Sequence, residues 1–359
     1  MMSMELYWFW LCMVPGIGIK TIDKLMRYFN TPRDVFDADR QQFERIQDID
    51  NAKKLAILNS RDRYIVERDY HKLAERNIHF ISYETSGFPR KLTHLPDMPK
   101  GIFYQGKLPK DDQLSIAIIG ARNCTSYGRE LAGDFAKQLA ANDIQVISGL
   151  ARGIDISAHR GALLGGGDTF GVLGCGVNVC YPREHIEVFE SMKSAGGIIS
   201  EYGMGVSPDA WRFPMRNRII SGLSDGIFIV EAGARSGALI TAYMGLEQGK
   251  DIFALPGRAM DASSEGCNDL IKAGAKMVTE PGEILEEYHT KIKKNKKSKI
   301  RLDKFEKLVY SSLCLIPKNI DEVADDVKLD ISQIIPVLLS LELKGYVKQA
   351  ARNHYIINI

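Results

Sequence analysis

Short turns that combine glycine with arginine recur in the middle of the chain, and that combination suits the binding of phosphate groups. Gly120 and Arg122 follow one apolar run, and Ser148, Gly149 and Arg152 follow the next. Glycine lets backbone N–H groups approach an anion closely, while the planar guanidinium group of arginine supplies a fork of donors. We therefore expect phosphate contacts from these turns, and the same pattern adds Gly153, Arg183, Ser236 and Gly237.

The segment from Trp211 to Arg218 places aromatic and apolar side chains between three arginines. Aromatic rings stack on bases and arginines bind phosphates, so this composition suits single-stranded nucleic acid. A competing interpretation is structural: the segment begins a helix, and Arg216 or Arg218 pairs with Glu201 or Glu231 to hold that helix on the sheet. The candidate contacts in this segment are Arg212, Phe213, Arg216, Asn217 and Arg218.

These turns come without the sequence features of a catalytic centre. Asp155 and His159 lie four residues apart and could form an acid–base pair, but no nucleophile or metal ligand accompanies them, which favours a structural turn. The turns match neither the GxGxxG nor the GxxxxGK[ST] phosphate motif, and the chain has no GxSxG elbow between a strand and a helix and no HExxH helix. The six cysteines form no CxxC pair. We expect a binding protein with no catalytic residue, no metal and no cofactor.

The elements that position these turns alternate between strands and helices. Unbroken apolar runs of four to six residues are typical of parallel strands that are buried on both faces. Their alternation with helical stretches predicts an α/β fold, an extended Rossmann-like doubly wound sheet, whose ligands bind at the carboxyl ends of the strands. The predicted strands are 115–119, 145–148, 169–173, 197–200, 226–230 and 250–254.

Two smaller units flank this predicted sheet. Residues 1–83 show helical periodicity and a glycine-rich hairpin at Pro15–Gly18, which together predict an all-α unit of the SAM or helix-hairpin-helix type. Predicted helices over 302–315, 320–327 and 332–344 and strands over 345–348 and 354–357 indicate a winged helix. We therefore divide the chain into a helical domain (1–83), a sheet domain (84–290), a basic linker (291–301) and a winged-helix domain (302–359).

The charges are distributed unevenly along the chain. The formal net charge of the whole chain is +2, which argues against a protein that binds nucleic acid through bulk charge. Residues 112–289 hold 22 acidic and 15 basic side chains, ten of them arginines, whereas residues 290–301 hold seven basic and no acidic ones. A local pocket in an acidic domain is therefore expected, together with a solvated basic linker. Reduced cysteines and the lack of a signal peptide or membrane span favour a cytoplasmic protein.

Taken together, the motifs resemble those of the DNA-processing protein A family (DprA, also called Smf). The resemblance covers about residues 84–280 in order. Its motifs are Ile119–Arg122 with Tyr127–Gly128, Ser148–Asp155 with Ala158–His159, Gly174–Gly176 with Tyr181–Pro182, Ser200–Tyr202, Phe213–Pro214 with Arg216–Arg218, Glu231–Ala232, Ser236–Gly237, Thr241–Ala242, Pro256–Gly257, and Asn268 with Leu270–Ile271.

The resemblance implies a non-enzymatic protein of natural transformation and homologous recombination. Such proteins bind and protect single-stranded DNA and help to load the RecA recombinase, and single-strand-binding protein is a further candidate partner. Family DNA contacts fall on Arg122, Arg183 and Phe213, with Phe213 as the stacking ring. The family dimer interface falls on Leu246, Asn268 and Ile271. Many members have lysine at the position of Ala210, and we expect Arg212 to take over that contact.

An alternative function remains open. The same sheet superfamily includes Lonely-Guy-type phosphoribohydrolases, which are nucleotide-binding and nucleotide-hydrolysing enzymes with a PGGxGTxxE stretch. Residues 231–237 of this chain lack that pattern. Release of free base from a nucleoside monophosphate would favour the enzyme.

Overall fold

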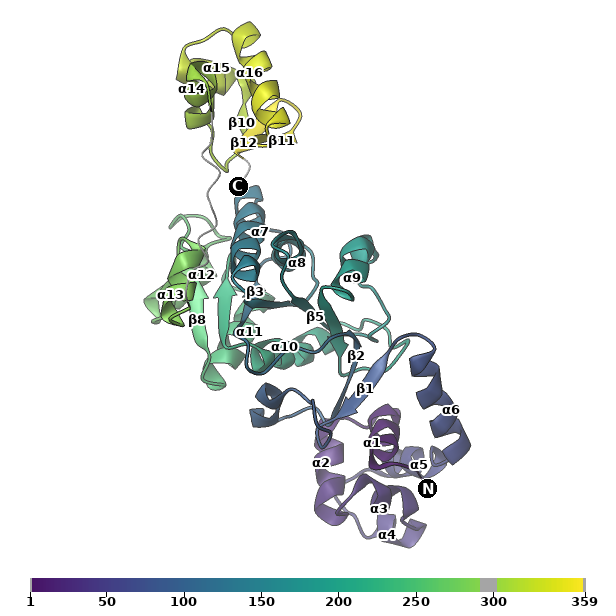
Figure 1. Ribbon diagram of the computed structural model, residues 1–359. Coiled ribbons are helices and arrows are strands. Elements are labelled where there is room, and N and C mark those ends of the chain that lie inside the picture. The colour runs from purple at the N-terminus through teal and green to yellow at the C-terminus, as the bar shows by residue number, and fades with distance from the viewer. Residues whose placement is uncertain (1, 291–301, 358–359) are drawn as a thin grey trace.

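A nine-stranded, mainly parallel sheet lies at the centre of the computed structural model, which describes residues 2–290 and 302–357 (Figure 1). The strand order is β1-β2-β6-β5-β4-β3-β7-β8-β9. Strands β1 and β2 run antiparallel to their neighbours, and the remaining pairs are parallel. The strands are β1 (His79–Ser82), β2 (Gly101–Gly106), β3 (Ser115–Ile119), β4 (Gln145–Ser148), β5 (Thr169–Leu173), β6 (Gly196–Ser200), β7 (Gly226–Ile229), β8 (Asp251–Ala254) and β9 (Lys276–Met277).

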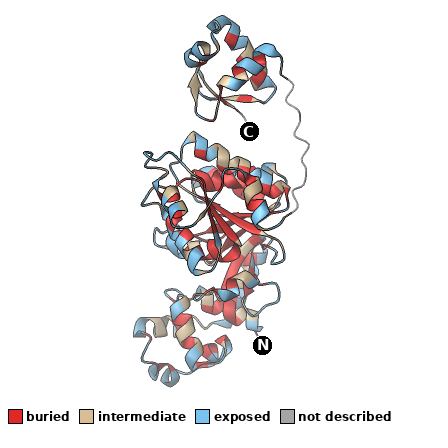
Figure 2. Cartoon of the chain, turned by 90° about the vertical axis from the view of Figure 1, so that its left-hand side faces the viewer, coloured by how far each residue is buried: buried red, intermediate tan, exposed pale blue. Residues whose placement is uncertain are grey.

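Helices cover both faces of the sheet, as its apolar strands require. On one face, Phe135 of α7 and Ala158 of α8 pack against Ile116, Ile118 and Phe228. On the other face, α10 and α11 pack against residues such as Ala117 and Ile229. Figure 2 shows the buried strands between helices whose outer faces are exposed. The helices are α7 (Ser126–Ala141), α8 (Ile154–Leu164), α9 (Ile186–Met192), α10 (Arg212–Leu223), α11 (Gly237–Glu247), α12 (Glu265–Lys272) and α13 (Pro281–Glu287), with short 3₁₀ helices η1 (Arg90–His94) and η2 (Arg183–His185).

The N-terminal part is helical up to β1. Its hydrophobic core is continuous with that of the sheet, because Phe9 packs edge-on against Phe80 of β1 and Phe103 of β2. Gly18 precedes α2, which no side chain caps. These helices are α1 (Met4–Met13), α2 (Ile19–Tyr28), α3 (Pro32–Asp37), α4 (Arg40–Glu44), α5 (Asn51–Asn59) and α6 (Arg63–Ala74).

The C-terminal part contains three helices and a three-stranded antiparallel sheet of order β10-β12-β11. Its own core includes Val309, Val323, Ile334, Leu338 and Val347. The elements are α14 (Lys304–Ser312), β10 (Lys318–Asn319), α15 (Ile320–Val327), α16 (Ile331–Leu343), β11 (Val347–Ala351) and β12 (His354–Ile357). The basic segment 291–301 lies outside the described residues.

The prediction of an α/β fold with a parallel-dominated sheet is confirmed, and each of the six predicted strands is present within one residue of its expected ends. One difference concerns β1, which lies inside the segment for which we expected only helices. Its partner β2 begins 19 residues after β1 ends. A four-residue strand that depends on such a distant partner leaves too short a local pattern to be predicted.

Candidate nucleic-acid interface

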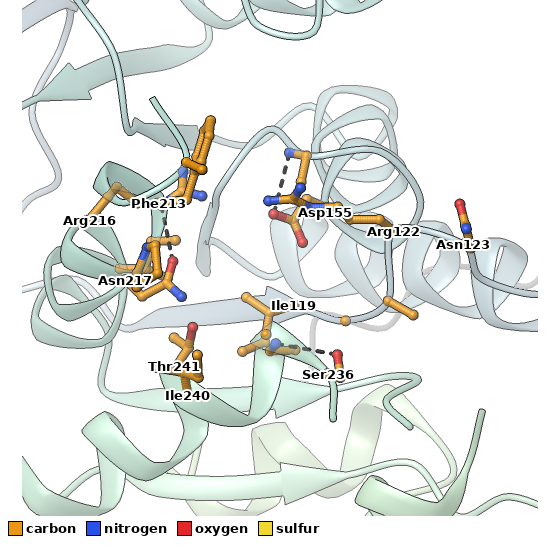
Figure 3. A pocket seen from close by; sticks show the side chains of 18 of the residues that line it. Ile119, Arg122, Asn123, Asp155, Phe213, Arg216, Asn217, Ser236, Ile240 and Thr241 are labelled. Atoms are coloured by element: carbon orange, nitrogen blue, oxygen red, sulfur yellow. Dashed lines mark hydrogen bonds between the residues drawn. The ribbon is translucent and has the colours of Figure 1, made fainter. Parts of the chain in front are cut away.

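A cleft of about 770 Å³ opens at the carboxyl ends of the parallel strands. Strands β4, β5 and β6 lie in that order on one side of β3, whereas β7 pairs with the other side of β3. The loops after β3 and β7 therefore diverge, and such a switch point is where open α/β sheets bind ligands. The cleft is lined by the turn after β3, the start of α10 and the start of α11 (Figure 3).

Arg122 lies at the edge of the cleft with an exposed side chain. The turn that carries it is fixed by its neighbours: Ala121 N donates to Glu231 O at 2.7 Å, and a Cβ on Gly120 would lie 2.6 Å from Ile154 Cγ1. No carboxylate of the described residues forms an ion pair with the Arg122 guanidinium group. That group is therefore free to bind an anion.

Phe213 is the aromatic ring of the cleft. Its position depends on Gly174 after β5, because a Cβ there would lie 2.9 Å from Phe213 Cδ1. The ring stacks on Tyr181 with centroids 5.7 Å apart and an interplanar angle of 29°. Arg122 Cζ lies 5.5 Å from the centroid of Phe213. A free guanidinium group and a partly exposed ring are thus adjacent, as a nucleotide requires.

Arg216 of α10 is buried beneath this pair. Its Nη1 donates to Gly149 O at 2.9 Å and also to Val172 O, so it ties α10 to β4 and β5. Asp155 lies close by and accepts from Gly149 N at 3.1 Å. Burial lowers the pKa of Arg216 to about 10, and burial raises the pKa of Asp155 against the opposing effect of Arg216. Arg216 remains charged at neutral pH and contributes a fixed positive charge to the cleft floor.

Arg218 faces away from the cleft. Its Nη2 donates to both carboxylate oxygens of Glu201 at 2.8 Å, and its Nε lies 2.8 Å from Asp97 Oδ2. The interpretation in which one arginine of α10 pairs with Glu201 is therefore confirmed for Arg218. Asn217 does line the cleft, where its Oδ1 accepts from Arg216 Nε at 3.1 Å.

The turn after β4 contributes less than its composition suggested. Ser148 is buried and donates to Ile118 O at 2.6 Å, so it holds two strands together. Gly153 has a φ of +76°, and a Cβ there would lie 2.3 Å from Ala121 O. Arg152 pairs in bidentate fashion with Glu184 at 2.7 and 2.9 Å.

Arg183, which begins η2 after β5, is exposed but lines neither this cleft nor the small hollow beside it.

Arg212 is held by residues of the segment that precedes α10. Its Nη1 lies 3.1 Å from Asp209 Oδ2 and also donates to Ser207 O. Its Cζ lies 4.9 Å from the ring of Trp211 and 5.1 Å from the ring of Tyr202. Ala210 lines the cleft whereas Arg212 does not.

The start of α11 forms the opposite wall of the cleft. Ser236 is the N-cap residue, and its Oγ accepts from Ala238 N at 3.3 Å. Leu239 N donates to the backbone oxygen of Ser236 at 3.1 Å, which leaves the N–H group of Gly237 as the donor that this turn can offer to an anion. A Cβ on Gly237 would contact nothing within 4 Å, so that position is open. Arg235 is exposed beside them. An N-terminus with a basic side chain suits a phosphate.

Asp155 and His159 form no acid–base pair. Asp155 accepts backbone hydrogen bonds within its own turn, whereas His159 is fully buried with its Nδ1 2.8 Å from Thr169 Oγ1. Burial lowers the pKa of His159 to about 3. Ser224, in the sequence Gly222–Gly226, is buried at the end of α10 and donates to Ile220 O, so it is not a nucleophile elbow.

Metal and membrane sites find no support in the structure. Across residues 2–290 and 302–357, no group of three or more His, Cys, Asp or Glu side chains is placed to hold a metal ion. No helix in those ranges combines the length and apolar character that crossing a membrane requires.

A second cavity of about 650 Å³ lies beyond β7 and is also lined by residues 315–317. Its walls carry the carboxylates of Glu231 and Asp261 but only one basic side chain, Arg258. The first cleft is lined by three arginines and one carboxylate, Asp155, so it attracts phosphates more strongly and is the better candidate for nucleic acid.

The three residues expected at a dimer interface have different surroundings. Leu246 of α11 is 52% exposed, and Ile271 of α12 is partly packed against the sheet core. Asn268 exchanges two 3.1 Å hydrogen bonds with the backbone of Gly257, which holds its own loop.

Three cleft or near-cleft residues were absent from the predicted set. Tyr181 stacks on Phe213, and Arg235 lines the cleft. Trp211 precedes α10 with an exposed ring. Tyr181 is an aromatic residue and Arg235 a basic one, and each lies in a turn that follows a strand. Those features could have added both residues to the predicted set.

Comparisons with known proteins show the family to which the chain belongs. Residues 79–289 match the family described as DNA recombination-mediator protein A. The chain is 43% identical to Protein Smf of Escherichia coli over 62% of this chain and 60% of Smf. It is 36% identical to DNA processing protein DprA of Streptococcus pneumoniae over 68% of this chain and 86% of DprA. The match thus spans less than two thirds of the E. coli relative.

Two solved structures are similar in fold. The X-ray structure of DprA from Streptococcus pneumoniae has a TM-score of 0.68 and 31% identity, with 80% of this chain and 98% of that chain covered. DprA from Helicobacter pylori, described as having a unique single-stranded DNA binding mode, has a TM-score of 0.53 and 29% identity, with 59% and 95% covered.

Proposed function

This chain belongs to the DNA recombination-mediator protein A family, and on that premise we propose that it binds and protects single-stranded DNA in natural transformation and homologous recombination. The observation that carries the proposal is the contact between Arg122 and Phe213. A guanidinium group that forms no ion pair with a carboxylate of residues 2–290 and 302–357 lies 5.5 Å from an aromatic ring at the open end of the sheet. One nucleotide could place its phosphate on the first and its base on the second.

The cleft favours a single strand over a duplex. A base can lie on the Phe213 ring only when it is unstacked from its neighbours, and single strands meet that condition without the cost of opening a duplex. The backbone N–H group of Gly237 at the start of α11, together with Arg235, extends the anion site along the other wall.

We propose no catalytic step. The buried acid and histidine that follow β4 are both engaged in structural hydrogen bonds, and neither lies against the other. The cleft therefore supports binding, with Arg122, Phe213 and the first turn of α11 as the principal contacts. The Lonely-Guy-like enzyme remains the competing function.

The flanking parts receive separate proposals. We assign residues 1–83 to a SAM-like or helix-hairpin-helix domain, 84–290 to a Rossmann-like domain, 291–301 to a linker that adds loose electrostatic attraction, and 302–359 to a winged helix. Helix α16 has no basic residue between Ile331 and Leu343. Its exposed apolar side chains are Ile331, Ile335, Leu339 and Leu343. This surface suits a protein partner better than DNA.

Assembly and partners complete the proposal. We place a homodimer contact on the exposed Leu246 face of α11, and we expect the cytoplasmic protein to deliver its DNA strand to the RecA recombinase. Single-strand-binding protein is a further candidate partner on the same strand.

The experiment compares binding to single-stranded and duplex DNA at two salt concentrations, with and without RecA. The expected result is tighter binding to the single strand, weakened by salt and by Arg122→Ala or Phe213→Ala, and faster RecA filament formation in the presence of the protein. Equal affinity for both DNA forms, or unchanged affinity in both variants, would show that this cleft is not the site.

A further inference from the structure

A large aromatic ring outside the cleft is exposed without an evident structural role. Trp211, the residue before α10, is 61% exposed, whereas the other two tryptophans of the chain, Trp8 and Trp10, are 1% and 3% exposed. Trp8 and Trp10 also donate their indole N–H groups to protein oxygens. Burying an aromatic ring is strongly favourable, so an exposed one that is held in place by its neighbours is a candidate contact for a partner.

Two side chains fix the orientation of Trp211. The edge of Tyr202 meets it at 87° with ring centroids 6.5 Å apart. The guanidinium group of Arg212 lies 4.9 Å from the Trp211 ring and 5.1 Å from the Tyr202 ring. The same guanidinium group forms an ion pair with Asp209 and donates a hydrogen bond to the carbonyl of Ser207. Burial raises the pKa of Tyr202 to about 12, so the phenol is neutral at physiological pH and adds no negative charge beside the Arg212 guanidinium group.

The cluster lies next to the cleft but on another side of α10. Successive helical residues are rotated by about 100°, so side chains two positions apart, such as those of Trp211 and Phe213, point to nearly opposite sides of the helix. Between them lies the start of α10, where no side chain caps the helix, Arg212 N donates to Asp209 O at 3.0 Å and Pro214 has no N–H group. The positive end of the helix dipole still attracts a phosphate there, and a strand that leaves Phe213 would cross this helix end to reach the Trp211 ring.

We propose that Trp211, oriented by Tyr202 and Arg212, is a second base-stacking platform for the strand that leaves the Arg122–Phe213 cleft across the start of α10. The proposal rests on the proposed function, because it requires single-stranded DNA in the cleft. It also gives Arg212 a task other than the direct phosphate contact expected from the sequence: its charge is held against two rings and strengthens stacking through the cation–π effect.

The test uses two readouts on the full-length chain. Binding of a labelled thymidine oligonucleotide of about 20 nucleotides, longer than the usual span of one such groove, is followed by fluorescence anisotropy. Stacking is followed by the intrinsic emission of Trp211, which an aqueous collisional quencher reports selectively because the other two tryptophans are buried. A matched oligonucleotide that carries abasic sites keeps the phosphates and removes the bases.

The variants are Trp211→Ala, Trp211→Phe and, as a control, Tyr64→Ala, which removes another exposed aromatic ring from α6. We expect the thymidine strand to change the Trp211 emission and to shield it from the quencher, and the abasic strand to do neither. Trp211→Ala weakens binding of the thymidine strand by about 5- to 150-fold, the range for one lost stacked base, and Trp211→Phe restores part of that loss. Tyr64→Ala leaves affinity unchanged.

The outcomes separate this inference from the proposed function. If the oligonucleotide binds normally but Trp211 emission and quenching do not respond, or if Trp211→Ala behaves like Tyr64→Ala, the platform is refuted and the cleft stands. If Trp211→Ala alters the molecular mass in solution and leaves DNA affinity intact, the ring belongs to a protein interface and the platform is likewise refuted. If no protein, wild type included, binds the oligonucleotide, the proposed function itself is refuted.

Discussion

Replacing Arg122 with alanine should change the salt dependence of DNA binding in a defined way. The side chain is exposed, it is part of a surface turn, and no carboxylate of the described residues pairs with it. Its removal therefore leaves the fold intact, and we expect the free energy of unfolding to change by no more than about 0.5 kcal/mol. What is lost is one phosphate contact and the charge beside Phe213.

The magnitude follows from the groups that line the cleft. Three arginines line it, Arg122, Arg216 and Arg235, but Arg216 is occupied by the carbonyls of Gly149 and Val172. Each phosphate neutralised on a single strand contributes about −0.7 to the slope of log K against log salt. Arg122→Ala should make that slope shallower by about 0.7. The affinity should fall by about 10- to 150-fold, the range for a charge-assisted hydrogen bond of about 1.5–3 kcal/mol.

Phe213→Ala gives the contrasting result. Losing a stacked base costs about 1–3 kcal/mol and removes no charge, so affinity falls while the slope stays the same. Because Arg122 lies against the Phe213 ring at 5.5 Å, the two losses should not be additive, and a double-mutant cycle measures the coupling.

The assay is anisotropy with a labelled single strand over about 50–300 mM salt, a range in which phosphate-dependent affinity changes steeply. Arg160→Ala is the control, because Arg160 is an exposed arginine of α8 that lines none of the cavities. An unchanged slope in Arg122→Ala, or an equal change in Arg160→Ala, would refute the assignment of Arg122 to a phosphate.

Three further predictions concern stability and assembly. Arg218→Met leaves the partly buried Glu201 and its neighbour Asp97 without their partner, so urea unfolding should show a loss of about 3 kcal/mol, the low end for a broken buried pair; a loss below 1 kcal/mol would contradict the pairing. His159 has a folded-state pKa of about 3 and an ordinary unfolded value of about 6.5, so below pH 6.5 protons bind preferentially to the unfolded chain. His159 should therefore lower the free energy of unfolding by about 2 kcal/mol from pH 7 to pH 5, and His159→Gln should reduce the measured fall by that amount in pH-resolved denaturation, while His185, whose pKa burial also lowers, keeps its own share. Leu246→Glu should shift the mass measured by light scattering from dimer to monomer without loss of secondary structure, and a wild-type monomer would rule out the α11 interface.

The sheet and the location of the cleft could be predicted because both depend on local patterns. Unbroken apolar runs are sufficient for strands that are buried on both faces, and the glycine turns that follow them must meet at one edge of a parallel sheet. The antiparallel β1 escaped prediction because its pairing with β2 depends on a partner outside the local window.

The separate tasks of the arginines could not be predicted from their spacing. Arg216 and Arg218 are two residues apart and both buried, yet one reaches the carbonyls of β4 and β5 and the other reaches Glu201. Their surroundings depend on which side of α10 faces the sheet. In the same way, the tie between Arg212 and Asp209 depends on the path of the loop before α10, which leaves no periodic pattern in the sequence.

The sheet domain is acidic overall yet holds an anion site, because only some of its arginines are paired with carboxylates. Arg152, Arg212 and Arg218 each lie beside a carboxylate, so most of their field is cancelled locally. Arg122 and Arg235 have no such partner among the described residues, and both line the cleft at the carboxyl ends of β3 and β7. Outside that cleft the excess of acidic side chains repels a polyanion, which disfavours binding over the rest of the surface. Selectivity for a strand with accessible bases then comes from the ring of Phe213, because charge alone would hold duplex and single strand alike.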